Sequence, residues 1–199
     1  MKEKSNFLLL IFLTFINFSC ENKNYQTEQD WVNAINDEEN GYFQSKTIND
    51  YNIEVFYKPL DLMVLQELGG KKQTVSYKDS IKNKYKNFVY FILRYSKENK
   101  ELLSTITESR DKFNMVQNTL TFGMLEKVTL TNQNNDTIQI VDYNFPRTYG
   151  LSKSTNLIFI FKRDENFIKS NEFTFNLQDI GIGIGDTKFK FKDNIIKEN

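Results

Sequence analysis

Hydrophobic and polar positions change their spacing along the chain, and each spacing predicts a kind of element. Apolar residues recur at helical intervals in three early stretches, residues 27–41, 60–69 and 79–87. Thr27 and Asp30 have the spacing of a capping box, which favours a helix start there, and Ser76 is a candidate cap for the third stretch. The first half of the chain is therefore expected to contribute short helices.

Alternation of apolar and polar residues predicts strands in much of the remaining chain. Residues 51–58 alternate cleanly, and the dense aromatic run at 88–95 is expected to be a central strand buried on both faces. From Thr119 onward the pattern predicts an antiparallel meander, with strands at 125–130, 138–143, 157–161, 173–177 and 189–191. Residues 98–118 show no clear period. We expect one α+β domain over residues 27–199, with short N-terminal helices followed by a mostly antiparallel sheet or sandwich.

Composition narrows the possible chemistry. The 199 residues carry 26 basic and 26 acidic side chains, and a chain without net charge lacks the strong field of a dedicated nucleic-acid binder. The chain contains no histidine, which excludes Ser-His-Asp and Cys-His catalysis and histidine-based zinc motifs. Cys20 is the only cysteine, so a paired-cysteine motif is also excluded. We expect no cofactor, no metal site built on these residue types and no nucleic-acid partner.

The first 20 residues have the pattern of an export signal. Lys2 and Lys4 precede an apolar run from Phe7 to Ile16, which is too short for a membrane-spanning helix of about 20 residues. The run ends in Asn17-Phe18-Ser19-Cys20, where a small residue stands immediately before the lone cysteine. This segment resembles the signal peptide and lipobox of bacterial lipoprotein precursors.

The resemblance implies that residues 1–19 are a signal peptide and that Cys20 is acylated and becomes the first residue of the mature chain. Residues 20–26 would then be a polar tether, and Glu21 after the cysteine favours the outer membrane. Several acyl chains anchor a protein stably where one does not. The expected location is the cell envelope, with the membrane as the first partner and an envelope protein as a further one. Plain secretion with a free thiol, or an uncleaved anchor, are the alternatives.

The segment between Asp179 and Asp186 is the most unusual in the domain. Gly181, Gly183 and Gly185 alternate with isoleucines, so backbone amides there can approach a ligand closely. The two carboxylates could supply oxygen ligands to calcium. A strand with a close-packed backbone, or a bulged hairpin, explains the same pattern. Ion or ligand binding and a purely structural role both stay open.

A cluster of lysines surrounds Tyr77 and Tyr85. Its members are Lys71, Lys72, Lys78, Lys82, Lys84 and Lys86. Asp79 is the only acid among them, so the patch has a net charge of +5, six lysines less one aspartate. Such a patch could contact acidic lipid headgroups or an acidic partner, and a solvated helix face is the alternative.

No complete catalytic constellation emerges from the sequence. Ser109 and Lys112 match S-x-x-K, but the companion motifs of penicillin-recognising enzymes are missing, and a helix start is the simpler interpretation. We therefore expect a lipid-anchored envelope lipoprotein that acts as a non-enzymatic binding, inhibitory or assembly component. The alternative is an envelope hydrolase acting on glycans, which requires two carboxylates about 5–10 Å apart in a cleft.

Overall fold

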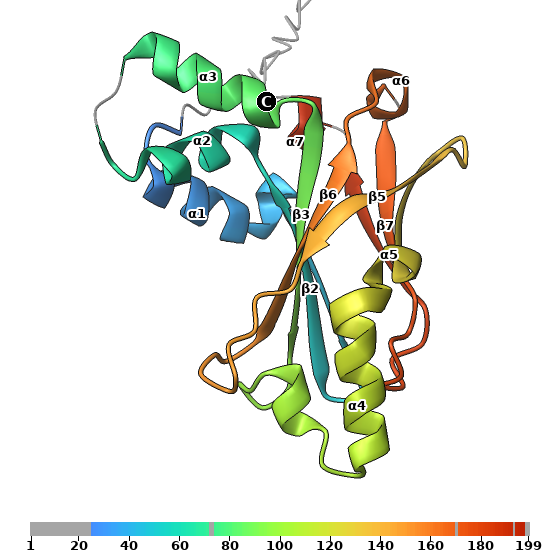
Figure 1. Ribbon diagram of the computed structural model, residues 1–199. Helices are drawn as coiled ribbons and strands as arrows, with labels where there is room; N and C mark the ends of the chain where they lie inside the picture. The colour runs from blue at the N-terminus through green and yellow to red at the C-terminus, as the bar shows by residue number, and fades with distance from the viewer. Residues whose placement is uncertain (1–24, 72–73, 170, 193, 198–199) are drawn as a thin grey trace, which may run out of the picture.

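The computed structural model describes residues 25–71, 74–169, 171–192 and 194–197. Within them, eight strands form one antiparallel sheet, accompanied by short helices (Figure 1). The strands are β1 Phe43–Ile48, β2 Tyr51–Lys58, β3 Phe88–Ser96, β4 Val128–Asn132, β5 Thr137–Asn144, β6 Thr155–Lys162, β7 Glu172–Leu177 and β8 Thr187–Lys192. The expected signal peptide, residues 1–19, and Cys20 lie outside the described residues.

The helices gather at the two ends of the sheet. They are α1 Glu28–Asn36, α2 Leu60–Leu68, α3 Val75–Tyr85, α4 Arg110–Asn118, α5 Met124–Lys127, α6 Glu165–Ile168 and α7 Asn194–Lys197, with short helical turns η1 Glu38–Asn40, η2 Leu102–Thr105 and η3 Thr119–Gly123. Figure 1 places α1, α2 and α3 at one end and α4 at the other. None of the helices in the described part of the chain has the length and apolar character needed to cross a bilayer.

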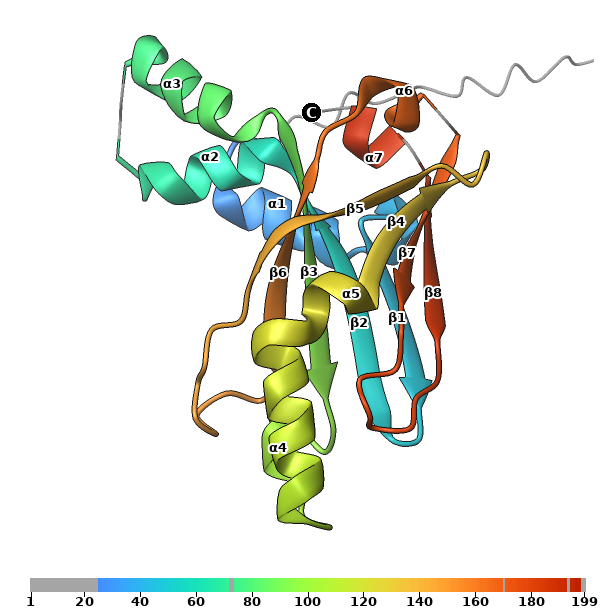
Figure 2. The ribbon, with the colours of Figure 1, turned by 45° about the vertical axis from the view of Figure 1, so that its right-hand side comes forward.

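The sheet curls so strongly that its two edge strands come close together. Its order is β1-β2-β3-β6-β5-β4-β7-β8, and all neighbouring strands are antiparallel. Figure 2 shows β1 beside β8. The Lys46 ammonium of β1 lies 5.5 Å from the ring centroid of Phe189 in β8, and the Asn49 amide donates to the Gly183 carbonyl at 2.7 Å. Curling turns one face of the sheet into a closed interior.

Phenylalanine rings fill this interior. The ring of Phe91 is fully buried, and the centroids of four other phenylalanine rings lie 5.5–5.9 Å away, with that of Tyr57 at 5.6 Å. The phenylalanine neighbours are Phe161, Phe173, Phe175 and Phe191. Pairs of this kind contribute about 0.5–1.5 kcal/mol each beyond the burial of their area. The aromatic core thus joins strands from both halves of the chain.

The predicted α+β class with a mostly antiparallel sheet is confirmed, but the order of its elements differs. β1 and β2 lie between α1 and α2, where the pattern at 51–58 predicts one strand, so the helices do not all precede the sheet. The two halves of the chain share one sheet because β3 pairs with β6. The helix expected after Thr27 is α1, whose capping box is complete: the Thr27 hydroxyl accepts the Asp30 N–H, and the Asp30 carboxylate accepts the Thr27 N–H.

Three local expectations are corrected by the structure. β3 is not buried on both faces. Its inner face is buried, whereas residues 88, 92, 94 and 96 on the other face are only half-buried. α3 begins at Val75 and is capped by the Thr74 hydroxyl, which accepts the Tyr77 N–H, so Ser76 is not the cap. Leu125 lies in helix α5 and not in a strand, since the helical backbone continues from α4 through η3.

The start of the domain includes the last two residues of the expected tether. The ring of Tyr25 lies 4.5 Å from that of Trp31, and the N–H of Gln26 donates to the Asp30 carboxylate at 3.2 Å. Trp31 itself is buried and packs edge-on against Tyr42. Residues 25 and 26 therefore belong to the packed domain.

Candidate functional site

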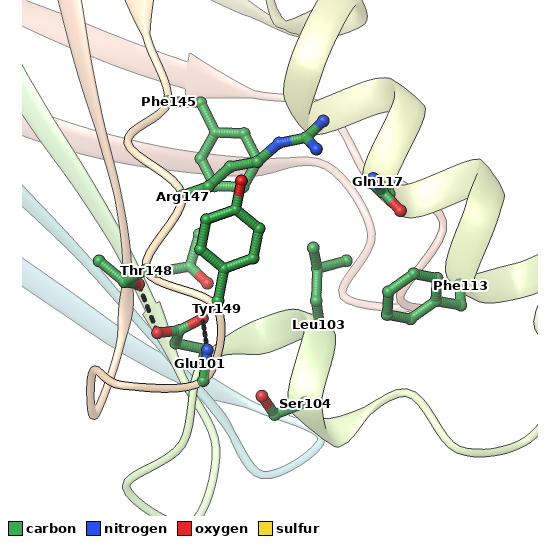
Figure 3. A pocket seen from close by; sticks show the side chains of 11 residues that line it. Glu101, Leu103, Ser104, Phe113, Gln117, Phe145, Arg147, Thr148 and Tyr149 are labelled. Carbon is green, nitrogen blue, oxygen red and sulfur yellow. Dashed lines mark hydrogen bonds between the residues drawn. The ribbon is translucent and has the colours of Figure 1, made fainter.

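A pocket of about 210 Å³ lies at the α4 end of the sheet, where η2, α4 and the loop from β5 to β6 meet (Figure 3). Its apolar walls come from Leu103 of η2, Phe113 of α4, and Phe145 and Tyr149 of the β5–β6 loop. The polar side chains that line it are Glu101, Ser104, Gln117, Arg147, Thr148 and Thr155. The pocket is thus an apolar recess with a small number of polar groups, the usual make-up of a ligand site.

Glu101 holds the β5–β6 loop against the pocket. Its side chain is only 7% exposed, and all the groups that it binds come from that loop. One carboxylate oxygen accepts the Ser152 N–H at 2.8 Å and the Thr148 hydroxyl, and the other accepts the Gly150 N–H at 2.9 Å. Hydrogen bonds to a charged acceptor contribute about 1.5–3 kcal/mol. We infer that this carboxylate fixes the shape of the loop.

The same contacts settle the charge of Glu101. Burial raises the pKa of the Glu101 carboxyl, but the Thr148 hydroxyl and the Gly150 and Ser152 amides lower that pKa by more. The pKa therefore lies below its ordinary value, and the group is ionised at neutral pH. A carboxylate that is ionised and already bound on both oxygens is a structural acceptor and is poorly suited to be a proton donor.

The loop displays two large apolar side chains to solvent. Tyr149 is 82% exposed and Leu151 is 92% exposed. The backbone of Tyr149 has a φ of 52°, in the left-handed region that costs a non-glycine residue about 1 kcal/mol. Gly150 follows with a φ of 81°, and the Leu151 N–H closes the turn on the Thr148 carbonyl at 3.0 Å. Packing within the domain does not account for these two side chains.

Arg147 ties the loop to the far side of the pocket. Its Nη2 donates to the Thr121 hydroxyl at 3.0 Å, which connects the loop to η3. On the opposite side, the Thr155 hydroxyl accepts the Leu102 N–H at 3.0 Å and joins the start of β6 to η2. The pocket is therefore framed by fixed contacts on both sides.

The glycine-rich segment forms the β7–β8 loop, and its carboxylates are used within the loop. The Asp179 carboxylate accepts the N–H groups of Gly181 at 3.0 Å, Ile182 at 3.1 Å and Gly183 at 3.0 Å. The Asp186 carboxylate accepts the Asp179 N–H at 3.1 Å. These contacts explain the segment without a ligand, and calcium binding stays a prediction.

The alternation in this loop also has a structural cause. Gly181, Gly183 and Gly185 all have positive φ, whereas the isoleucines between them point inward and are buried. The segment contains no strand and is the irregular loop that joins the antiparallel strands β7 and β8. Among the residues that the structure describes, no group of three or more acidic or cysteine side chains could hold a metal ion.

Three lysines of the cluster, Lys78, Lys82 and Lys84, lie on α3, and two of them pair with acidic residues of α2. Lys82 pairs with Asp61 at 3.3 Å, and Lys84 pairs with Glu67 at 3.1 Å. Lys71, Lys78 and Lys86 are exposed, and Lys72 lies outside the described residues. Because both acids come from a different helix, the net charge counted along the sequence overstates the local field.

The serine–lysine pair begins α4. The Ser109 hydroxyl accepts the Lys112 N–H at 3.1 Å as an N-cap, and the Lys112 ammonium pairs with Glu108 at 3.0 Å. The carboxylate of Glu108, and not the serine hydroxyl, is thus the partner of this lysine in the described residues. The arrangement matches the simpler interpretation, a helix start.

A shallow hollow of about 560 Å³ beside α1 contains two carboxylates. Asp30 is engaged in the capping box, and Asp37 accepts the Glu39 N–H at 3.0 Å as the cap of η1. Each acid therefore stabilises a helix start. The hollow offers no pair of free carboxylates of the kind that glycan hydrolysis requires.

No protein-family model, curated protein or solved structure matches this chain.

Sequence reasoning missed the pocket residues Glu101, Arg147 and Tyr149. Glu101 binds residues that are 47 to 51 positions away in the sequence, and no local pattern predicts such contacts. One signal was present: an aromatic and an aliphatic residue stand between Pro146 and the lysine at 153, in a stretch with turn-forming residues.

Proposed function

We propose that this protein is a lipid-anchored lipoprotein of the cell envelope, held at the outer membrane by acyl chains on Cys20. In this proposal it acts there as a non-enzymatic binding, inhibitory or assembly component, and its binding surface is the pocket with the β5–β6 loop. The anchor rests on the sequence Asn17-Phe18-Ser19-Cys20. The observation that carries the binding function is the display of Tyr149 and Leu151 on a loop that Glu101 fixes in place.

A fixed backbone makes exposed apolar side chains effective in binding. Ordering a loop or a side chain on association costs free energy, and a surface that is already ordered avoids most of that cost. Tyrosine adds a large contact area with few rotatable bonds. The contacts of Glu101 and Arg147 keep the loop in one arrangement before a partner arrives. This supports recognition by the loop.

The contacts of the acidic residues support a non-enzymatic role. Glu101 is the only carboxylate among the described residues that line the pocket, and both its oxygens are occupied. The alternative of a glycan hydrolase would need two free carboxylates, and Asp30 with Asp37 in the hollow beside α1 are committed to helix caps. Turnover of a glycan that Asp30→Asn abolished would establish the alternative.

Site-specific photo-crosslinking in living cells tests the binding surface. A photoreactive phenylalanine analogue replaces Tyr149 in the full chain, and the matched control carries it at Tyr77, which is 47% exposed on α3. We expect a discrete adduct from position 149 and none of the same size from position 77. Ser104→Phe, which fills the pocket, should abolish the adduct, whereas Thr107→Phe, which adds the same ring outside the pocket, should not. Equal adducts from positions 149 and 77 would contradict the proposal.

The anchor is tested separately. Mass spectrometry of the mature protein should find a diacylated N-terminal cysteine at residue 20, and Cys20→Ala should retain the leader and lose the lipid. An unacylated chain released in soluble form would contradict the proposed lipid anchor. It would have no bearing on the proposed binding surface.

A further inference from the structure

Arg147 places a positive charge at the rim of an apolar pocket. Figure 3 shows its guanidinium reaching toward α4 and Gln117, across the recess from Leu103. Only its bond to the Thr121 hydroxyl joins it to another side chain, and no carboxylate of the described residues lies within ion-pair distance. A guanidinium has five N–H donors, so most of them remain available to a ligand.

The β5–β6 loop as a whole carries positive charge, as Arg147 does. Residues 145–154 include Arg147 and Lys153 and no acidic residue. A guanidinium matches the geometry of a carboxylate and can bind it through two parallel hydrogen bonds. Tyr149 also lines the pocket, and its hydroxyl is a further hydrogen-bond donor there. The rim is therefore complementary to an anion.

The volume of the pocket limits the apolar part of a ligand. An apolar cavity of about 150 Å³ is large enough to hold benzene. The pocket, with about 210 Å³, has room for one aromatic ring or one branched aliphatic group and a short linker. Leu103 and Phe113 form the apolar wall against which such a group would pack.

We propose that the pocket binds a carboxylate carried on a single ring-sized apolar group, with the carboxylate paired to Arg147 and the group packed against Leu103 and Phe113. This inference rests on the proposed function, since it names the ligand class of the same surface. The chemistry is shared by two sources, the apolar C-terminal residue of a partner polypeptide and a small aromatic acid.

The second charge of the pocket orients the ligand. Glu101 is also a lining residue, and an ionised carboxylate repels another one. Its oxygens are turned to the three loop donors, and in Figure 3 the side chain lies on the Ser104 side of the pocket, away from the guanidinium. The ligand carboxylate is thus directed to Arg147 and the apolar group to the interior.

Titration calorimetry on the full chain in detergent, with micelles alone as the blank, tests the inference. The first pair of ligands is 3-phenylpropanoate and its primary amide. The second pair is a short peptide that ends in phenylalanine, with a free or an amidated C-terminus. We expect the free acid of at least one pair to bind about tenfold more tightly than its amide, the usual effect of losing a hydrogen-bonded charge. Arg147→Gln should abolish that preference, and Lys153→Gln in the same loop should keep it.

The outcomes separate the ligand sources and the two proposals. Binding of 3-phenylpropanoate identifies a small acid, and binding of the free peptide alone identifies a polypeptide terminus. Equal affinity for acid and amide, an unchanged preference in Arg147→Gln, or no binding of either acid would overturn the inference. A crosslinked adduct at Tyr149 that persists in those cases would leave the proposed binding surface standing. The acid–amide comparison on the unmodified chain does not depend on the folding of any variant.

Discussion

Two loops of this protein use the same hydrogen-bonding arrangement and send their apolar side chains in opposite directions. In the β7–β8 loop, the Asp179 carboxylate accepts three consecutive N–H groups, from Gly181 to Gly183. In the β5–β6 loop, Glu101 accepts the N–H groups of Gly150 and Ser152 together with a hydroxyl. In each loop, one acidic side chain accepts several hydrogen bonds from the loop.

The direction of the apolar side chains separates the roles of the loops. Ile180, Ile182 and Ile184 of the β7–β8 loop are buried, whereas Tyr149 and Leu151 of the β5–β6 loop are exposed. Burial of an aliphatic side chain stabilises a fold by about 1.5–3 kcal/mol, and an exposed one contributes almost nothing. Stability therefore accounts for the first loop, and for the second we propose recognition of a partner.

The largest expected effect is a difference in the free energy of unfolding between variants of the two loops. Ile180→Ala should lower the free energy of unfolding by about 2–4 kcal/mol, because it leaves a cavity in the core. Leu151→Ala should change it by less than about 0.5 kcal/mol, as an exposed substitution does. Urea unfolding of both variants measures the difference. Equal losses would show that Leu151 is held by the fold after all.

Removal of the charge that organises the β5–β6 loop should have the next largest effect. Glu101→Gln should lower the free energy of unfolding by about 1–3 kcal/mol, because the loop amides lose a charged acceptor. Hydrogen exchange at Gly150 and Ser152 should accelerate, while exchange at Gly181 and Gly183 stays as in the parent. Asp179→Asn should give the reverse pattern. Unchanged exchange at Ser152 in Glu101→Gln would contradict the role of Glu101.

The charge of Glu101 should also appear as a dependence on pH. Its folded-state pKa is lowered from an ordinary value of about 4.5. The stabilisation is therefore fully present above that ordinary value and is lost as the pH falls through the folded-state pKa. The stability difference between the parent and Glu101→Gln should be constant near neutral pH and shrink below about pH 4.5. A difference that grows on acidification would have the wrong sign.

The smallest expected effect on stability concerns Tyr149. Tyr149→Gly relieves a left-handed backbone but adds freedom to the unfolded chain, so stability should change by less than about 1 kcal/mol. Asn135→Gly is the matched control, since Asn135 has a similar φ of 63° in the β4–β5 turn. Both variants should unfold alike, and only Tyr149→Gly should lose affinity for the acid ligand. Retained affinity in Tyr149→Gly would exclude this side chain from recognition.

Local signals in the sequence predicted a large part of the fold. The capping box formed by Thr27 and Asp30 predicted α1, because it involves only residues close together in the sequence. Alternating apolar residues predicted β7, at Phe173 and Phe175, and β8, at Phe189 and Phe191. The alternation is visible because each strand has one buried face. Such features depend on residues a few positions apart, and the sequence displays them directly.

Features that depend on distant contacts could not be predicted. The pairing of β3 with β6 joins residues that are 60 to 74 positions apart, and it makes one sheet from the two halves of the chain. Residues 98–118 lack a single period because they contain two short helical segments, η2 and α4, with non-helical residues between them. The candidate site was missed for the same reason, since Glu101 acts on the β5–β6 loop from a distant position.

Footprinting of tyrosines in intact envelopes tests the central claim most directly. The full chain is oxidised by hydroxyl radicals, once in intact envelopes and once after purification, and modification at Tyr149 and Tyr77 is compared by mass spectrometry. The account predicts that Tyr149 is protected in envelopes and reactive in the purified protein, while Tyr77 reacts equally in both. Equal modification of Tyr149 in the two states would show that nothing binds the β5–β6 loop in the envelope, and would contradict the account.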